Sequence, residues 1–333
     1  MSWFPGSLRF HQEESDRKMV EQNERSTETF ANGGDSRRRR LEIQQMMDKQ
    51  SIRRRLFDKI ATGVVIACVI AAIIPLGSIL IEVVKNGADA LSLEFLTQPP
   101  GAIGSGRGGI GPAIQGTLIV IALASLIGAP VGVMAGIYLS EFAGSGKFPY
   151  VVRFLNDVLT GLPSIVVGIV GYVAIVLTIG SFSVWAGAFA LSIIMIPIVV
   201  RVTEETLKIV PNSIREAGYS LGIPKWKVVM FIVLTSAKSG VLTGIVLALS
   251  RIAGETAPLI MTILGTSLFF TSFTNPVDAL PLRIWRLASQ PYESAHEFGW
   301  GAALILILLV LAMSVGLRML AYKKGFRVKS IAA

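Results

Sequence analysis

The sequence predicts an all-α membrane protein with six transmembrane helices. Hydrophobic residues make up 52% of the 333 residues and charged residues only 16%, and the mean hydropathy is +0.62. This composition is too apolar for an ordinary soluble protein. In addition, apolar segments recur with the length of about 20 residues that a helix needs to cross the hydrocarbon core of a membrane.

Each expected span is an apolar run bounded by charged or turn-forming residues. The fourth run is short, and the fifth contains polar interruptions. Glycines and prolines within the second to fourth runs are expected to allow close helix packing or bending. The expected spans cover roughly residues 60–83, 113–139, 151–179, 184–200, 231–264 and 298–321.

The distribution of Lys and Arg predicts the orientation, because short positively charged segments stay on the cytoplasmic side. The long segment 258–298 contains only two basic residues, Arg283 and Arg286, as expected outside the cell. We therefore expect a multi-pass protein of the cell (plasma) membrane with both termini in the cytoplasm. The basic residues that flank the spans on the cytoplasmic side are Arg53, Arg54, Arg55, Lys59, Lys208, Arg215, Lys225, Lys227, Lys323, Lys324, Arg327 and Lys329.

Two domains are expected, a polar tail over residues 1–56 and a transmembrane domain over residues 57–333. The tail mixes acidic and basic residues without a sustained apolar period, which predicts disorder. Residues 41–56 fit either a short helix on the inner leaflet or a solvated basic linker. The first apolar run begins near Ile60, too far along the chain for a cleaved signal peptide.

The sequence argues against metal, cofactor and catalytic chemistry within this chain. Cys68 is the single cysteine, and the two histidines, His11 and His296, lie far apart, so no metal site is expected. A formal Gly-x-Gly-x-x-Gly over residues 106–111 follows no strand, and no Gly-x4-Gly-Lys-Ser/Thr loop occurs. The net charge of +9 is assigned to topology and lipid headgroups rather than to nucleic acid.

The segment between the fourth and fifth spans, about residues 201–231, predicts two short helices joined by a turn. Pro211 can open the first helix, Gly222 can end it, and Pro224 suits the first turn of the second. A compact pair of helices that returns the chain to the membrane is well placed to transmit a push. The simpler alternative is an ordinary cytoplasmic helix hairpin.

This segment resembles the cytoplasmic loop of permeases of ATP-binding-cassette importers. Their pattern is Glu-Ala-Ala, three residues, Gly, nine residues, then Ile-x-Leu-Pro. Glu216, Ala217 and Gly222 keep the spacing, whereas Gly218 replaces the second alanine and Thr235 replaces the proline. The resemblance implies that Glu216, Ala217 and Gly222 dock on an ATPase subunit, which would supply the energy for transport.

A wider resemblance covers nearly all of residues 57–329 and is to the A-type phosphate permeases. It implies the type I importer permease fold, and a complex with a second homologous permease, two ATPase subunits and an external phosphate-binding protein. The function implied is passage of inorganic phosphate between the two permeases. The phrases that carry the resemblance span residues 108–117, 136–141, 161–168 and 248–259.

Four residues are candidates for the substrate path. Arg251 and Glu255 are spaced to share one helical face, and charged groups in a span normally pair or face a water-filled path. Arg251 could attract phosphate while Glu255 limits trapping of the anion; the alternative is a structural ion pair. Arg201 could release phosphate inward or extend to the headgroups. Ser164, after Pro163, could expose backbone amides to an anion or serve packing.

Three rival functions remain open on the sequence alone. The chain could be a permease for another oxyanion such as sulfate or molybdate. It could also be the partner C-type phosphate permease, which shares much of the pattern. A channel or gradient-driven carrier that works alone would transport without an ATPase, and the 201–231 segment would then have no partner.

Overall fold

The computed structural model describes residues 57–102, 108–144 and 146–323. The chain forms two compact units, Met1–Ser78 and Ile79–Ala333, and each is described by itself. Within the described ranges the regular elements are all helices, and β pairing is limited to an isolated bridge between Pro100 and Gly108. The prediction of an all-α fold is therefore confirmed. The predictions for the tail 1–56, for its segment 41–56 and for His11 lie outside the described residues.

Five described helices are long and apolar enough to cross a membrane, and a bent pair would make a sixth span. The first of them, Phe57–Ala88, contributes residues to both units. The other elements are, in chain order, α2 (Leu93–Thr97), α3 (Gly111–Ile137), η1 (Tyr138–Phe142), α4 (Lys147–Gly161), α5 (Ser164–Gly171), η2 (Tyr172–Val176), α6 (Leu177–Ile179), α7 (Val184–Ile209), α8 (Asn212–Ser220), α9 (Lys225–Lys227), η3 (Val228–Val233), α10 (Leu234–Ala253), α11 (Ala257–Thr262), α12 (Leu280–Ala288) and α13 (Glu293–Lys323).

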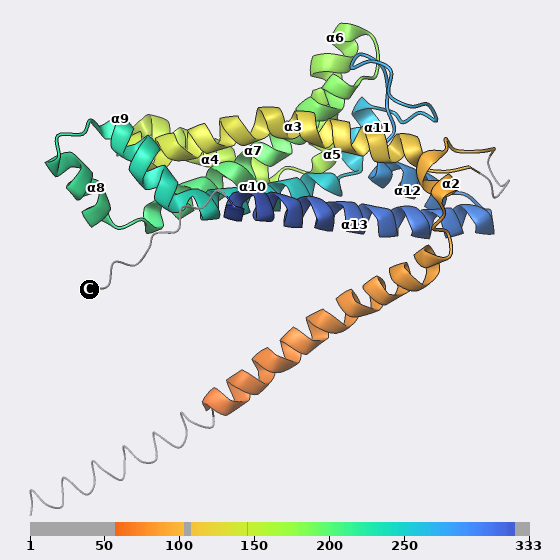
Figure 1. Ribbon diagram of the computed structural model, residues 1–333, viewed down its shortest axis with the longest axis horizontal. Coiled ribbons are helices and arrows are strands. Elements are labelled where there is room, and N and C mark those ends of the chain that lie inside the picture. Colours follow the sequence, from red (N-terminus) through yellow and green to blue (C-terminus); the bar gives the residue numbers. More distant parts are fainter. Residues whose placement is uncertain (1–56, 103–107, 145, 324–333) are drawn as a thin grey trace, which may run out of the picture. The chain divides into compact units, whose positions relative to one another are not determined.

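The centre of the second unit is a bundle of α3, α7 and α10, with α13 packed on α10 (Figure 1). Its core contains buried apolar residues from all three central helices, among them Val120, Met195 and Ile252. Apolar residues on the outside of the same bundle are exposed, as Leu126 (72%) and Met134 (70%) show. A helix surface of this kind suits lipid rather than water.

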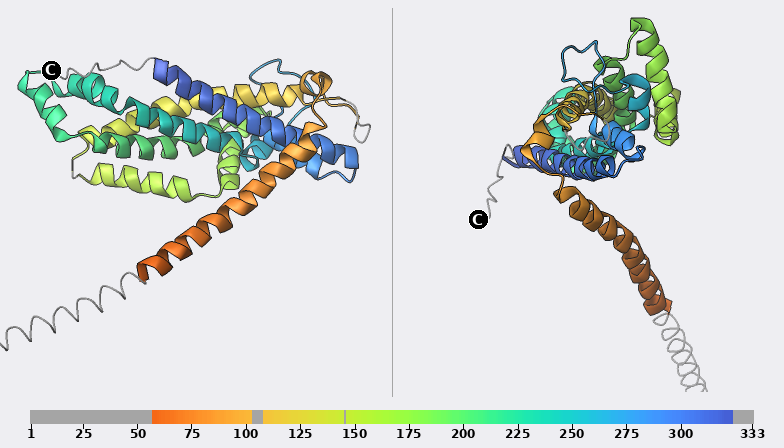
Figure 2. Two further views of the ribbon diagram at one scale, coloured as in Figure 1. Left: turned by 60° about the horizontal axis from the view of Figure 1, so that its bottom comes forward. Right: turned by 90° about the vertical axis from the view of Figure 1, so that its right-hand side faces the viewer.

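The two ends of the bundle are closed by different elements. At one end α8 packs on η3, supported by a cluster that includes Leu207, Val228 and Val233. At the other end α2 and α12 meet α3 and α13 around Phe95 and Leu280 (Figure 2). The long helices therefore separate the loop that contains α8 from the loop that contains α12.

Glycines spaced at four residues bring α3 close to α7. A Cβ atom at Gly132 would lie 2.7 Å from Val199 Cβ, and one at Gly136 would lie 2.6 Å from Thr203 Cβ. Residues four apart share one face of a helix, and small residues on such a face are typical of closely packed membrane helices. The expectation that these glycines serve packing is confirmed.

Substitution of one of these glycines should destabilise the bundle. Gly132→Leu would force a side chain into Val199, at a cost of about 1–3 kcal/mol or more. The control is Gly316→Leu in α13, where a Cβ atom meets nothing within 4 Å. The thermal midpoint of each variant in detergent measures the difference, and equal midpoints would contradict the packing account.

The third expected span, 151–179, is not one straight helix. α4 ends at Gly161, α5 begins at Ser164, and the two are bent by 105°. Leu162 between them has an extended backbone (φ −69°, ψ 136°), because the ring of Pro163 disfavours the helical conformation in the preceding residue. The expected span 151–179 is therefore bent beside Pro163, one of the residues expected to allow bending, and the segment is a broken span or a re-entrant loop.

Side chains rather than apolar packing alone hold α4 against α7. Arg153 Nε donates to Glu204 Oε1 at 2.9 Å, and Arg153 Nη2 donates to the carbonyl oxygen of Leu139 at 2.9 Å. Asn156 Nδ2 donates to the carbonyl oxygen of Pro197 at 3.3 Å, within the buried interface. Hydrogen bonds of this kind join helices where there is no water to compete.

The structure differs from three expected boundaries near the 201–231 segment. α7 continues to Ile209, well past residue 200, because the buried carboxylate of Glu204 is neutralised by Arg153 and by Lys208 Nζ at 2.6 Å. The expected second short helix of the 201–231 segment is instead the start of the fifth membrane-length helix, Lys225–Ala253. That helix ends at Ala253, so residues 231–264 do not form one continuous helix.

Candidate functional site

The helix α8 forms the exposed tip of the loop between α7 and α9. Pro211 lies at its N-terminal boundary, and Gly222 follows its end with φ +73°, a left-handed conformation that glycine adopts without steric cost. Glu216 and Ala217 are exposed on α8. The sequence therefore predicted the first helix and its turn correctly.

Arg215 anchors α8 to the bundle, and sequence reasoning missed it. Its guanidinium donates to both carboxylate oxygens of Glu141, at 2.6 Å and 3.1 Å. It also donates to the carbonyl oxygens of Leu207 at 2.9 Å and Val210 at 2.5 Å. Only 14% of the Arg215 side chain and 4% of the Glu141 side chain are exposed. The hydrogen bond to Glu141 raises the pKa of Arg215 above its ordinary value, so the guanidinium stays charged.

Two π-helical segments flank this anchor. Glu141 belongs to η1, at the end of α3, and η3 packs directly on α8. π-helical turns are uncommon and often occur at functional positions. The loop is thus joined to two membrane-length helices at places where their backbone geometry changes.

The packing of α8 on η3 explains why a glycine occupies position 218. A Cβ atom at Gly218 would lie 2.9 Å from Val228 Cγ2 and 3.3 Å from Ile232 Cδ1. An alanine there would push α8 away from η3 unless these side chains moved. The glycine that departs from the Glu-Ala-Ala pattern therefore leaves room for the Val228 and Ile232 side chains that face it.

Large apolar side chains are exposed around α8. Ile209 and Leu221 are each 79% exposed, and Trp226 is 54% exposed. They flank the polar tip of α8 on the chain before and after it. Exposed apolar residues beside an anchored helix are what a protein-protein contact requires.

Arg251 and Glu255 pair across a break in the helix. α10 ends at Ala253, Gly254 follows, and α11 begins at Ala257. Arg251 Nη1 donates to Glu255 Oε1, with 58% of the Arg251 side chain exposed but only 6% of the Glu255 side chain. The predicted contact is present, although the helix that was expected to present both residues is interrupted between them.

The chain at this break packs against α5, which follows the bend after α4. A Cβ atom at Gly168 would lie 2.8 Å from the Cα atom of Pro258, so the two backbones touch. Ser164, the first residue of α5, is half-buried. The structure thus brings α5 to α11, but it records no direct contact between Ser164 and Arg251.

Arg201 lies in a different environment, among carboxylates. Its Nε donates to Glu205 Oε1 at 2.5 Å, and its Nη1 lies 3.8 Å from Asp157 Oδ1. All three side chains are more than half exposed, at 58%, 56% and 66% respectively. Two carboxylates around one guanidinium give the cluster a net negative charge, which disfavours the binding of an anion.

The described residues offer no assembled metal site. Within the described ranges no group of three or more His, Cys, Asp or Glu side chains could hold a metal ion. His296 Nε2 instead lies 2.7 Å from the carbonyl oxygen of Gln290.

Comparison with known proteins identifies this bundle of membrane-length helices, with the anchored helix α8 at one end, as a transport permease. Residues 128–324 match the family described as "Binding-protein-dependent transport system inner membrane component". The structure of a bacterial alginate ABC transporter is 15% identical with a TM-score of 0.58, covering 80% of this chain and 95% of that chain. The methionine ABC transporter MetNI gives 15% identity and a TM-score of 0.53, covering 63% and 95%. These two likenesses show the fold.

Sequence relatives narrow the class. A phosphate transport system permease protein PstA from Yersinia pestis is 41% identical over 279 residues, 83% of this chain and 94% of that protein. A probable PstA from Methanocaldococcus jannaschii is 38% identical over 268 residues, 80% and 94% of the two chains. The chain therefore belongs to the PstA family of binding-protein-dependent permeases.

Proposed function

We propose that this chain is the membrane-spanning permease subunit of an ATP-driven importer of inorganic phosphate. The observation that carries the proposal is the Arg251–Glu255 pair, a partly exposed guanidinium held by a buried carboxylate at a helix break, in a chain whose relatives are named phosphate permeases. A guanidinium is the side chain best suited to bind a phosphate group through two parallel hydrogen bonds.

The geometry explains how Arg251 could pass an anion rather than trap it. In the described part of the chain one nitrogen of Arg251 is committed to Glu255, and the other donors are left for a ligand. Glu255 fixes the direction of the guanidinium and offsets its charge, so that binding is weak enough for release. We assign Arg201 a structural role, because Glu205 and Asp157 already surround it. Ser164 remains a candidate for the path through its place at the start of α5.

The orientation follows from the basic residues around α8. Lys208, Arg215, Lys225 and Lys227 lie in or beside this loop, whereas the segment 263–279 between α11 and α12 contains no Lys or Arg. The positive-inside rule then places α8 and both termini in the cytoplasm, and α12 outside. The protein would lie in the plasma membrane as half of the passage, beside a second homologous permease.

We further propose that α8 is the contact for an ATPase subunit. Glu216 and Ala217 are exposed on its surface, Gly222 ends it, and Leu221 and Trp226 offer apolar anchors. Closure of two ATPase subunits on ATP would then pull α8, and Arg215 would carry the pull to η1 and α3. An external binding protein would deliver phosphate at the opposite end.

A substitution at the tip of this loop should separate the permease from its ATPase. Leu221→Asp places a charge in the proposed contact and is expected to lower the amount of co-purifying ATPase about tenfold or more. Leu268→Asp is a matched control, because Leu268 is 71% exposed but belongs to the opposite end of the bundle. Equal recovery of ATPase with both variants would count against the proposed contact.

Transport of labelled phosphate by the reconstituted complex tests the function itself. Uptake should require ATP and should be competed by unlabelled phosphate but not by sulfate or molybdate. If sulfate or molybdate competes as well as phosphate, the result favours a permease for another oxyanion. If the chain alone transports phosphate without ATP, the result favours a channel or carrier that works without an ATPase.

A further inference from the structure

A small cavity lies at the end of the bundle opposite α8, between α12 and the first turns of α13. Its volume is about 160 Å³. At about 30 Å³ for each water molecule in the liquid, this is room for several waters or for one tetrahedral oxyanion. The lining combines an apolar wall, which includes Ile110 and Phe298, with a few polar groups from separate segments. The polar side chains are Ser267, Arg283, Arg286, Gln290 and Ser294.

Arg283 and Arg286 are three residues apart on α12 and therefore lie on the same face. Arg283 is 5% exposed and is fixed by an ion pair with Asp278, which is itself fully buried. Burial raises the pKa of Asp278, and the neighbouring guanidinium of Arg283 opposes that shift. The contact between the Asp278 carboxylate and the Arg283 guanidinium holds Arg283 in place.

Arg286 is held differently, by a backbone turn. Its Nη2 donates to the carbonyl oxygen of Leu264 at 2.8 Å. Leu264 and Gly265 have φ of +60° and +79°, and a Cβ atom at Gly265 would lie 2.6 Å from Arg286 Nη2. Leucine rarely adopts such a conformation, which costs of order 1 kcal/mol. The turn thus has the shape that lets Arg286 approach, and the sequence supplies a glycine where the approach is closest.

The charge in this cavity is not balanced by the described residues. In the described part of the chain Arg286 forms no ion pair within 4.0 Å, so two guanidiniums face one carboxylate. One nitrogen of Arg286 is occupied by Leu264, and its other donors remain available. The hydroxyls of Ser267, which is exposed, and of Ser294, which is half-buried, also line the cavity and can donate to a ligand. Guanidinium, hydroxyl and amide donors together are the chemistry that recognises a phosphate group.

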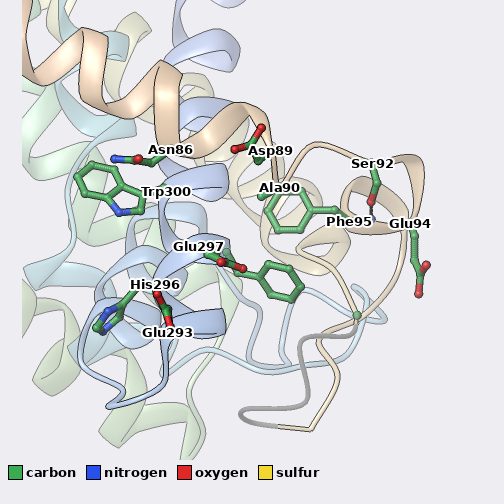
Figure 3. A pocket seen from close by; sticks show the side chains of 12 residues that line it. Asn86, Asp89, Ala90, Ser92, Glu94, Phe95, Glu293, His296, Glu297 and Trp300 are labelled. Carbon is green, nitrogen blue, oxygen red and sulfur yellow. Dashed lines mark hydrogen bonds between the residues drawn. The ribbon is translucent and has the colours of Figure 1, made fainter.

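A neighbouring cavity of about 660 Å³ has the opposite character. Figure 3 shows its carboxylates, of which Asp89 and Glu94 come from the chain at and before α2, and Glu293 and Glu297 from the first turns of α13. Glu293 and Glu297 line this acidic cavity, while Ser294 between them in sequence lines the arginine cavity. An anion that reaches this end of the protein is therefore repelled on one side of α13 and attracted on the other.

We propose that the cavity between α12 and α13 binds a phosphate group, with Arg286 as the principal ligand, Arg283 as a fixed neighbouring charge, and Ser267 and Ser294 as further donors. The group would come either from inorganic phosphate arriving before it reaches Arg251, or from the headgroup of an anionic lipid. That inorganic phosphate is the ligand rests on the proposed function. That the cavity binds a phosphate group does not. This site is separate from the Arg251–Glu255 pair, which lies at the break after α10.

Equilibrium binding to the permease–ATPase complex in lipid nanodiscs, prepared without the external phosphate-binding protein, tests this site. All variants carry Arg251→Gln so that the proposed path site does not contribute. In nanodiscs of phosphatidylcholine, Arg286→Gln should weaken the binding of radiolabelled inorganic phosphate about tenfold or more, through loss of a charge-assisted contact. Ser294→Asp should have the same effect by placing a negative charge in the cavity while leaving Arg286 in place. The control is Arg318→Gln, an exposed arginine on α13 that does not line the cavity.

A second arm distinguishes the two sources. Native mass spectrometry of complexes from nanodiscs containing phosphatidylglycerol would show a retained lipid that Arg286→Gln loses and Arg318→Gln keeps, if the headgroup is the ligand. Loss of either phosphate or lipid binding in both cavity variants supports the site. If both variants bind phosphate and lipid as the control does, the site is refuted. Because binding is measured and not transport, this outcome is distinct from a failure of the importer to move phosphate.

Discussion

Arg251→Gln is expected to abolish phosphate uptake while the permease still assembles with its partners. Two charge-assisted hydrogen bonds to the anion, at about 1.5 kcal/mol each, correspond to about a hundredfold loss of the transport rate. The fold should survive, because 58% of the Arg251 side chain is exposed and glutamine keeps an amide donor for the Glu255 carboxylate. ATP-dependent uptake of labelled phosphate into vesicles measures the effect.

Arg201→Gln is a closely matched control for this prediction. Arg201 has the same side-chain exposure, 58%, and the same pairing to a glutamate four residues later. It differs in having a second carboxylate, Asp157, within 4.0 Å. Uptake by Arg201→Gln should stay within about threefold of the unmodified chain, as for an exposed ion pair worth less than about 1 kcal/mol. If the two variants lose uptake equally, the special role of Arg251 is contradicted.

Arg215→Met should uncouple the importer. It leaves the buried carboxylate of Glu141 without its partner, and removal of one member of a buried pair costs about 3–5 kcal/mol. The carbonyl oxygens of Leu207 and Val210 also lose their donor. Since α8 would then no longer be fixed to η1, ATP hydrolysis should continue with little phosphate moved. The ratio of phosphate transported to ATP hydrolysed measures this coupling.

A double substitution separates uncoupling from simple misfolding. Glu141→Gln with Arg215→Met removes the unpaired charge, so the double variant should be more thermally stable than Arg215→Met alone. Its transport ratio should nevertheless stay low, because the link between α8 and η1 is still missing. Lys208→Met is the control, since Glu204 keeps Arg153 as a partner. A double variant with a normal transport ratio would show that Arg215 serves stability alone.

The sequence predicted the spans better than their interruptions. The segment 151–179 is apolar on both sides of its bend, so hydropathy does not reveal the 105° change of direction at Leu162 and Pro163. The fourth span was expected to end at residue 200 because polar residues follow it. It continues because Glu204 is buried between two cations, a compensation that depends on Arg153, 51 residues away in the chain.

The candidate site was predicted where its partners are local and missed where they are distant. The spacing of Arg251 and Glu255 predicted their contact, and the turn at Gly254 preserves it. Arg215 was counted as one basic residue of a cytoplasmic segment, because its partner Glu141 lies 74 residues earlier. A carboxylate at the end of an expected membrane helix, with no cation three or four residues away in the sequence, was the available indication that a distant arginine must approach.

The central claim is that this permease carries phosphate only when a separate ATPase acts on α8. The most direct measurement compares phosphate uptake into vesicles that contain the whole complex with uptake into vesicles that contain the permease pair without the ATPase. We expect uptake that depends on ATP in the first and none above background in the second. Equal uptake in both preparations, with or without ATP, would contradict the account.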